Sequence, residues 1–155
     1  SPQEGYEYGI VDEPGLPMLE EALEKYPGLK FIGHSQPFWH EISQDAKPDL
    51  KSRMEWGKGP VKEGGRLVCL MRNYKNLYAD LSANSGGCAI MRDEKFGLQF
   101  LEEFQDRLMF GTDMVNTDMV FPLGEWLDRQ YQEGKLSAQA YRKICFENAK
   151  KIFQL

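Results

Sequence analysis

The sequence predicts an α/β fold in which parallel strands alternate with helices. Three short apolar segments with β-forming residues recur along the chain, at residues 29–34, 76–82 and 107–113. Segments with the period of amphipathic helices lie before, between and after them. Each segment between two strands is long enough for the crossover that parallel neighbours require. We therefore expect one parallel sheet with helices packed against it.

The first helix and the first strand are expected near the start of the chain. Leucines recur on one face of residues 16–26 and glutamates occupy other positions, which is the pattern of an amphipathic helix. A Pro-Gly pair ends this helix. Residues 29–34 (LKFIGH) form a short apolar run that predicts a buried strand, with His34 as its last residue.

A long segment separates the first strand from the second. Residues 35–65 show no sustained period and contain several prolines and glycines, so we expect them to be mostly irregular. A helix is expected over residues 66–74. Residues 76–82 (NLYADLS) then alternate apolar with polar or aromatic side chains, which predicts the second strand.

The third strand is expected between further helices. Residues 96–104 have helical spacing, and Asp93 is placed to cap their first turn. Residues 107–113 (RLMFGTD) form the third predicted strand. A helix is expected over residues 123–132, and Ser137 is expected to cap a long final helix.

Composition and charge exclude several classes of protein. The 155 residues are 41% hydrophobic and 28% charged, which is typical of one globular domain. A net charge of -5 offers no basic field for nucleic acid or anionic lipid. No apolar run reaches the roughly 20 residues that span a bilayer, and the opening segment does not have the pattern of a signal peptide. We therefore expect a cytoplasmic protein with free cysteines and without nucleic acid or membrane partners.

The predicted sheet is too small to be a complete structure. Three parallel strands cannot close into a barrel, and their faces stay partly exposed unless more chain or another copy covers them. The chain also begins without methionine, in a segment that we expect to be a loop. We therefore expect a part of something longer, completed by a missing N-terminal half or by a homo-oligomer.

Polar residues mark the end of each predicted strand. His34 ends the first, Asp80 and Ser82 lie at the end of the second, and Asp113 ends the third. In a parallel α/β sheet these strand ends share one rim, where the active site is built. Asp113 is well placed to bind a metal or to take a proton from water, although a helix cap is the alternative. Structural hydrogen bonding is the alternative for His34 and stays open for Asp80.

The long segment 35–65 carries aromatic and cationic side chains, among them Trp39 and Arg53. Such side chains suit a lid over an anionic organic substrate. We therefore expect Trp39 and Arg53, together with Ser82, to bind the substrate. Solvated loop charges are the alternative explanation.

Several motifs of other enzyme and binding classes are absent from the sequence. There is no glycine-rich phosphate loop, which disfavours an open flavodoxin-like binding module, and no nucleophile elbow or paired-cysteine zinc pattern. The chain has only two histidines, so it cannot build a histidine-rich metal site alone.

Four segments taken together resemble the last three strands and terminal helix of the amidohydrolase-related family. The segments are FIGHSQPFW at 31–39, NLYADLSANSG at 76–86, RLMFGTD at 107–113 and ENAKKIFQL at 147–155. That family includes metal-dependent hydrolases, lactonases and decarboxylases similar to aminocarboxymuconate semialdehyde decarboxylase. The resemblance implies that residues 1–155 are the C-terminal portion of one (β/α)8 TIM barrel domain.

The resemblance also implies roles for the strand-end residues. Asp113 would ligate a divalent metal, usually zinc, and accept a proton from water. His34 would orient or polarise the substrate, or bind a second metal. The family's His-x-His on the first strand and its histidine on the fifth have no counterparts here, so the isolated segment is expected to be inactive.

The function implied is a metal-dependent hydrolase that acts on a small organic substrate, including carboxylate-bearing ones, through metal-activated water. A metal-dependent decarboxylase of the same family is the first alternative. A non-catalytic half-barrel that binds ligands as a scaffold is an alternative of another class.

Overall fold

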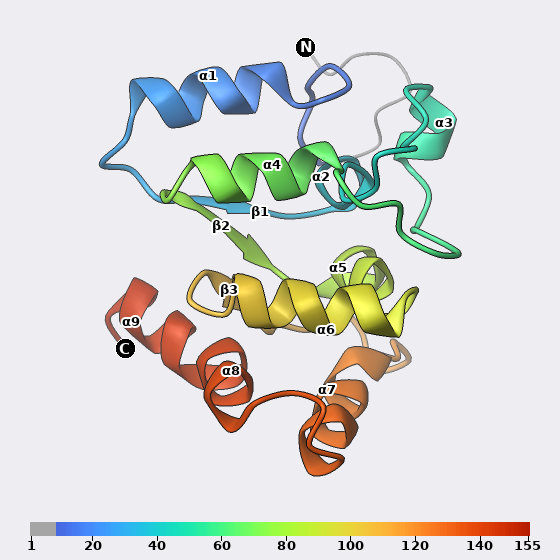
Figure 1. Cartoon of the computed structure of the whole chain (residues 1–155), viewed down its shortest axis with the longest axis vertical. Helices are drawn as coiled ribbons and strands as arrows, with labels where there is room; N and C mark the ends of the chain where they lie inside the picture. The colour runs from blue at the N-terminus through green and yellow to red at the C-terminus, as the bar shows by residue number, and fades with distance from the viewer. Residues whose placement is uncertain (1–8) are drawn as a thin grey trace.

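The computed structural model describes residues 9–155, and most of the loop expected at the start of the chain lies outside them. Its helices and strands are α1 (Pro17–Lys25), β1 (Phe31–Gly33), α2 (Gln36–His40), α3 (Leu50–Arg53), α4 (Arg66–Asn73), β2 (Leu77–Asp80), α5 (Ala83–Met91), α6 (Glu94–Glu103), β3 (Leu108–Met109), α7 (Pro122–Gln132), α8 (Ala138–Arg142), a π-helical turn η1 (Lys143–Glu147) and α9 (Asn148–Phe153). Figure 1 shows the strands between helices that precede and follow them in the chain. The expected α/β class is confirmed.

The strands form one parallel sheet in the order β1, β2, β3. Phe31 lies opposite Leu77 in the first pair, and Ala79 lies opposite Leu108 in the second. All three strands are shorter than predicted, and β3 has only two residues. The backbone N–H of the next residue, Phe110, donates instead to the closing helical segment. The parallel arrangement follows the prediction, and the strand lengths do not.

One face of the sheet is buried beneath helices. Leu77, Ala79 and Leu108 point to this face and are inaccessible to solvent. The apolar sides of α1, α4 and α6 join them in one continuous core. Burial of this apolar surface is the main favourable contribution to folding.

The opposite face of the sheet is only partly covered. Side chains alternate along a strand, so Ile32, Tyr78, Asp80 and Met109 share this second face. Ile32 remains 37% exposed, whereas Met109 is buried. Residues of α9 line the same hollow as Met109, so cover is present beside β3 and incomplete beside β1.

Helix α5 was not predicted, because Gly86 and Gly87 interrupt the apolar period. The structure explains one of these glycines. A Cβ at Gly86 would lie 2.7 Å from the backbone of Leu81, so α5 packs directly against the end of β2. The segment 35–65 is mostly irregular, as predicted, and contains only the short helices α2 and α3.

The predicted helix caps are confirmed, whereas the single closing helix is not. The side chain of Asp93 accepts a hydrogen bond from Phe96 N at 3.1 Å, and that of Ser137 accepts one from Ala140 N at 3.1 Å. The closing segment is then divided by η1 into two α-helical pieces. At η1 the carbonyl of Ile144 accepts a hydrogen bond from Phe110 N at 2.8 Å, which ties the helix to the end of β3.

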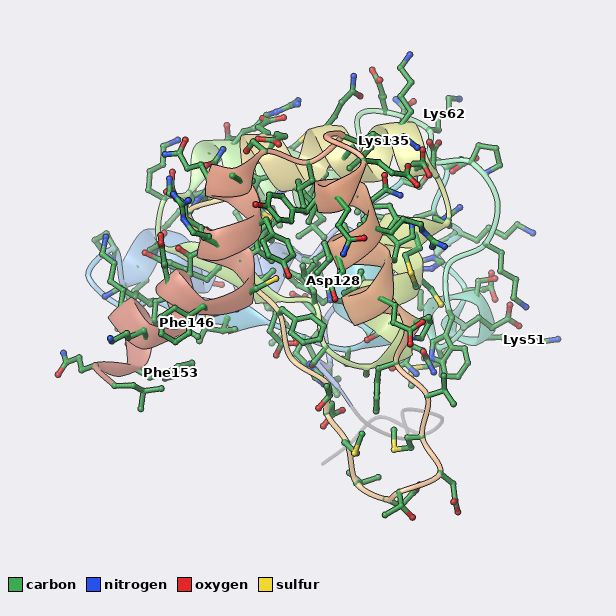
Figure 2. The ribbon with its side chains drawn as sticks, turned by 90° about the horizontal axis from the view of Figure 1, so that it is seen from below. Lys51, Lys62, Asp128, Lys135, Phe146 and Phe153 are labelled. Carbon is green, nitrogen blue, oxygen red and sulfur yellow. The ribbon has the colours of Figure 1, made fainter. Side chains whose placement is uncertain are left out.

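The segment between β3 and α7 projects away from the body of the molecule, as Figure 2 shows from below. The side chains of Val115 and Val120 in this segment are 78% and 74% exposed. None of the helices within residues 9–155 has both the length and the apolar character needed to cross a membrane. The three cysteines are free, as expected.

Candidate active site at the carboxyl ends of the strands

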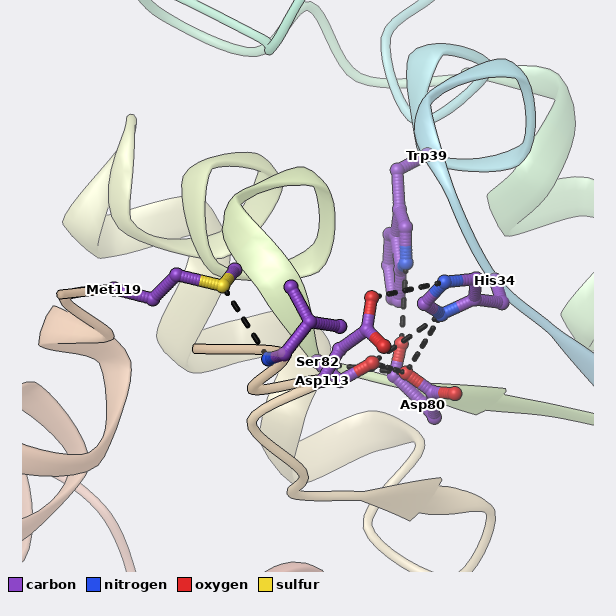
Figure 3. A network of polar contacts seen from close by, with 7 residues as sticks. His34, Trp39, Asp80, Ser82, Asp113 and Met119 are labelled. Carbon is purple, nitrogen blue, oxygen red and sulfur yellow. Dashed lines mark hydrogen bonds and ion pairs between the residues drawn. The ribbon is translucent and has the colours of Figure 1, made fainter. Parts of the chain in front are cut away.

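The carboxyl ends of the three strands bring together four polar side chains, which we call the strand-end cluster: His34, Asp80, Ser82 and Asp113 (Figure 3). His34 directly follows β1, and Asp80 is the last residue of β2. The parallel sheet therefore assembles side chains from all three strand ends, as predicted from the sequence.

The backbone is strained where the chain leaves each strand. Ser35, Ala83 and Asp113 have φ angles of 73°, 56° and 53°. In this left-handed region a side chain other than glycine costs on the order of 1 kcal/mol. Among the described residues, only Leu16 and Gln154 are further non-glycine residues with positive φ. Strain of this kind, held at three adjacent strand ends, is typical of a functional site.

Asp80 is the centre of the hydrogen bonding in the cluster. Its Oδ1 lies 3.2 Å from His34 Nδ1 and accepts a hydrogen bond from Ser82 N at 2.9 Å. The Ser82 hydroxyl donates to the same oxygen and lies 3.2 Å from His34 Nδ1. The indole Nε1 of Trp39 donates to the Asp80 carbonyl oxygen at 3.1 Å. Asp80 is thus bonded through both its side chain and its backbone.

The pKa values of His34 and Asp80 move in opposite directions. The hydrogen bond to Asp80 raises the pKa of His34 above its ordinary value and outweighs burial, which lowers it. Burial alone would raise the pKa of Asp80, but hydrogen bonds from His34 and Ser82 bring it below its ordinary value. Asp80 therefore stays ionised at neutral pH.

Asp113 faces the other nitrogen of the His34 ring. Its Oδ2 lies 3.7 Å from His34 Nε2, and the two side chains are 45% and 33% exposed. This separation exceeds the length of a direct hydrogen bond and leaves room for an atom that bridges the two groups. His34 consequently connects a buried carboxylate on one side to an exposed carboxylate on the other.

The cluster opens into a cleft of about 480 Å³. All four cluster residues line it, and its other walls are mostly apolar. These walls are formed by Ile32, Met109, Phe110, Gly111, Ala149 and Phe153. An apolar hollow with a few convergent polar groups is the usual form of a small-molecule site.

The structure does not bring Trp39 and Arg53 into this cleft. The Trp39 side chain is buried and packs edge-on against Phe38, with the ring centroids 5.4 Å apart. Arg53 is also buried, and its Nη1 donates to the Asp12 carbonyl oxygen at 2.8 Å. Of the three residues expected to bind substrate, only Ser82 lines the cleft. The substrate-binding roles of all three stay predictions.

Two groups of the cluster have the chemistry of metal ligands, His34 Nε2 and the Asp113 carboxylate. The carboxylate contact at His34 Nδ1 is the contact that metal-binding histidines commonly make with their second nitrogen. Within residues 9–155, however, no group of three or more His, Cys, Asp or Glu side chains is arranged to hold a metal ion. The residues present therefore fit part of a ligand set, and a complete set needs further ligands.

Sequence reasoning missed the apolar walls of the cleft. Ala149 and Phe153 belong to the final helix and follow the π-helical turn η1. No sequence pattern signalled that turn. For Asp80, the hydrogen-bonded role that the sequence left open is the one that the geometry supports.

Comparison with known proteins gives one match. A family model described as Amidohydrolase matches residues 10–155, which is nearly the whole chain. No curated protein and no solved structure matches the chain.

Proposed function

The chain belongs to the amidohydrolase family, and from this membership we propose that it is part of a metal-dependent hydrolase acting on a small organic substrate through metal-activated water. The observation that carries the proposal is the position of Asp113. It follows the last strand, has a strained backbone and faces His34 Nε2 across 3.7 Å in an open cleft. A carboxylate and an imidazole nitrogen so placed suit both metal ligation and proton transfer.

In this proposal His34 and Asp113 hold a divalent metal, for which zinc is the first candidate. When bound, the metal supplies Lewis-acid polarisation and lowers the pKa of a water ligand. The Asp113 carboxylate, which is exposed to the cleft, takes the proton from the attacking water. Because Nδ1 is bonded to Asp80, Nε2 of His34 cannot both hold the metal and act on the substrate. The alternative role of His34, when Asp113 and further ligands hold the metal, is to orient or polarise the reacting group of the substrate. The apolar walls bind the rest of the substrate and exclude bulk water.

We further propose that residues 1–155 form the C-terminal part of one (β/α)8 barrel domain. Two observations support this. Ile32 on the partly covered face of the sheet is 37% exposed, and an apolar hollow of about 340 Å³ lies along β1, lined by residues that include Ile10, Phe31 and Phe38. An N-terminal half would cover this surface and supply the remaining metal ligands. A homo-oligomer is the other way to cover it.

A decarboxylase of the same family would use the same residues. The distinction rests on the substrate, and assaying the purified protein with carboxylated and non-carboxylated candidates separates the two reactions. A catalytically empty half-barrel is favoured by the lack of a three-ligand group within residues 9–155. That alternative predicts no stoichiometric metal.

The experiment that tests the proposal is elemental analysis of the full-length protein purified without chelator. We expect about one equivalent of divalent metal, and we expect Asp113→Asn to lose both the metal and metal-dependent turnover, because the amide is a weaker ligand and cannot accept the proton. Asp118→Asn is the matched control, since Asp118 lies in the same exposed segment and does not line the cleft. Full metal content and activity in Asp113→Asn would refute the proposal.

A further inference from the structure

The hydrogen atoms around His34 Nδ1 can be assigned by counting donors. Three groups meet at Asp80 Oδ1: His34 Nδ1, the Ser82 backbone N–H and the Ser82 hydroxyl. An ionised carboxylate only accepts hydrogen bonds. Each of the three groups must therefore place a hydrogen atom between itself and Oδ1.

The Ser82 hydroxyl has one hydrogen atom, and its contact with Asp80 uses it. The hydroxyl therefore has none to donate to His34 Nδ1, 3.2 Å away, and can only accept. Both contacts of Nδ1, with Asp80 and with Ser82, then require the hydrogen atom to be on Nδ1. In the neutral ring, Nε2 is consequently the nitrogen with the lone pair.

Asp80, whose carboxylate accepts the hydrogen bond from His34 Nδ1, is itself held in place. Trp39 is buried and its indole donates to the Asp80 carbonyl oxygen, while the Ser82 N–H donates to the carboxylate. These bonds restrict both the backbone and the side chain of Asp80. The direction in which His34 presents Nε2 is therefore set by a fixed partner and not by solvent.

We propose that Asp80 is a positioning residue, which keeps the hydrogen atom of His34 on Nδ1 and so presents the Nε2 lone pair towards Asp113. The inference deepens the proposed function and rests on it for the chemistry that occurs at Nε2. A neutral Nε2 is the form that ligates a metal or accepts a proton. The opposite tautomer would direct an N–H at the space between His34 and Asp113, where it could not serve as a ligand.

The chain provides an internal reference for testing this assignment. It has only two histidines, and the second, His40, places Nε2 at 2.8 Å from the Lys47 carbonyl oxygen. A carbonyl oxygen only accepts, so His40 must carry its hydrogen atom on Nε2. The two histidines are therefore expected to be opposite tautomers in the same molecule.

The experiment is ¹⁵N NMR of the imidazole rings in the full-length, metal-free protein, at a pH where both rings are neutral. His34→Gln and His40→Gln each remove one ring, and so assign the signals of both histidines among any others in the full-length protein. We expect the lone-pair nitrogen of His34 to be Nε2 and that of His40 to be Nδ1. In Asp80→Ala, the His34 signals should move towards the Nε2–H tautomer while those of His40 stay unchanged. Ser82→Ala should keep the Nδ1–H form, because Asp80 remains.

A His34 ring with its hydrogen atom on Nε2 in the unsubstituted protein would overturn the proposal, and so would an unchanged tautomer in Asp80→Ala. The first result does not depend on Asp80→Ala, so it decides the question even if that variant does not fold. Titration with Zn²⁺ adds an independent measurement. Loss of the outer partner of a metal-binding histidine typically weakens metal binding by about 10–100-fold, and we expect that loss in Asp80→Ala.

The two proposals fail in different ways. If His34 has the expected tautomer but neither the parent protein nor its variants bind Zn²⁺, the positioning role stands and the metal-dependent function is refuted. If the parent protein and Asp80→Ala bind Zn²⁺ equally well, the metal site stands and the positioning role falls.

Discussion

The two ends of the same sheet are built in different ways. At the amino end, the side chains of Arg107, Asn76 and Asn148 donate to backbone carbonyl groups. None of residues 26–31, 74–77 and 105–108, all of them described, has a positive φ. At the carboxyl end, side chains bond mainly to one another, and the backbone is strained at three exits.

This difference separates stability from chemistry. Bonds from side chains to backbone carbonyls fix the positions of neighbouring segments. Carboxylates and an imidazole that face one another in a cleft provide reactive groups. Substitutions at the amino end should therefore lower the free energy of unfolding, and substitutions at the carboxyl end should change the chemistry.

The largest effect on stability is expected for Arg107→Ala. The Arg107 guanidinium donates to the carbonyl oxygens of Tyr74, Leu77 and Met71 at 2.9, 3.0 and 2.6 Å. Losing these charge-assisted bonds should lower the free energy of unfolding by about 3 kcal/mol. Urea unfolding measures this, with Arg129→Ala on the exposed side of α7 as the control. A loss no greater than that of the control would contradict the division between the two ends.

A smaller loss is expected for Asn148→Ala. The buried Asn148 amide donates to Gln105 O at 2.6 Å and to Leu108 O at 2.8 Å. Two carbonyl groups left without this donor should lower the free energy of unfolding by about 2 kcal/mol. The same urea measurement applies. Asn116→Ala, in the exposed segment after β3, should change it by less than about 0.5 kcal/mol.

A change of opposite sign is expected at the strained carboxyl end. Ala83 has a φ of 56°, and glycine adopts this conformation without steric cost. Ala83→Gly should therefore raise the free energy of unfolding by about 0.5–1 kcal/mol, after the greater entropy of the unfolded glycine is subtracted. Lys75→Gly at the amino end, where φ is negative, should lower it. If both substitutions lower the free energy of unfolding equally, the backbone at Ala83 does not carry the expected strain.

The smallest effect is expected at the surface of the amino end. Arg72 Nε and Nη2 donate to the two carboxylate oxygens of Glu103 at 2.7 and 2.9 Å, and this pairing lowers the pKa of Glu103. Its stabilisation should be present above the ordinary glutamate pKa of about 4.3 and lost as the pH falls through the lower folded value.

Because both partners of this ion pair are largely exposed, the contribution should be only a few tenths of a kcal/mol. The difference in unfolding free energy between the parent protein and Glu103→Gln, measured near neutral pH and at acid pH, gives its size. If this difference in the free energy of unfolding grows as the pH is lowered, the expected pH dependence of the ion pair has the wrong sign.

The sequence predicted the features that depend on local pattern. The parallel order of the strands and the caps Asp93 and Ser137 follow from hydrophobic period and short-range bonding. The rim position of His34 and Asp113 follows from parallel topology. The carboxylate at Asp80 was also recognised, although its role was left open.

The features that the sequence did not predict depend on contacts between distant segments. Arg53 is buried and donates to the Asp12 carbonyl oxygen, and Trp39 is buried against aromatic neighbours, and neither position could be read from the sequence of segment 35–65. Gly86 allows helix α5 to pack directly against the end of β2. Such positions depend on tertiary packing and override local propensity.

The π-helical turn η1 has a consequence for the phase of the final helix. One additional residue in a turn rotates all that follows by about 100° relative to an unbroken α-helix, since there are 3.6 residues per turn. Ala149 and Phe153, which line the cleft, lie after this rotation. Deleting one residue from 143–147 would turn a different side of the final helix towards the cleft. The four residues of the strand-end cluster would remain unchanged. The shape of the cleft is therefore encoded partly by the length of the chain at η1, and not only by the identity of the side chains that line it.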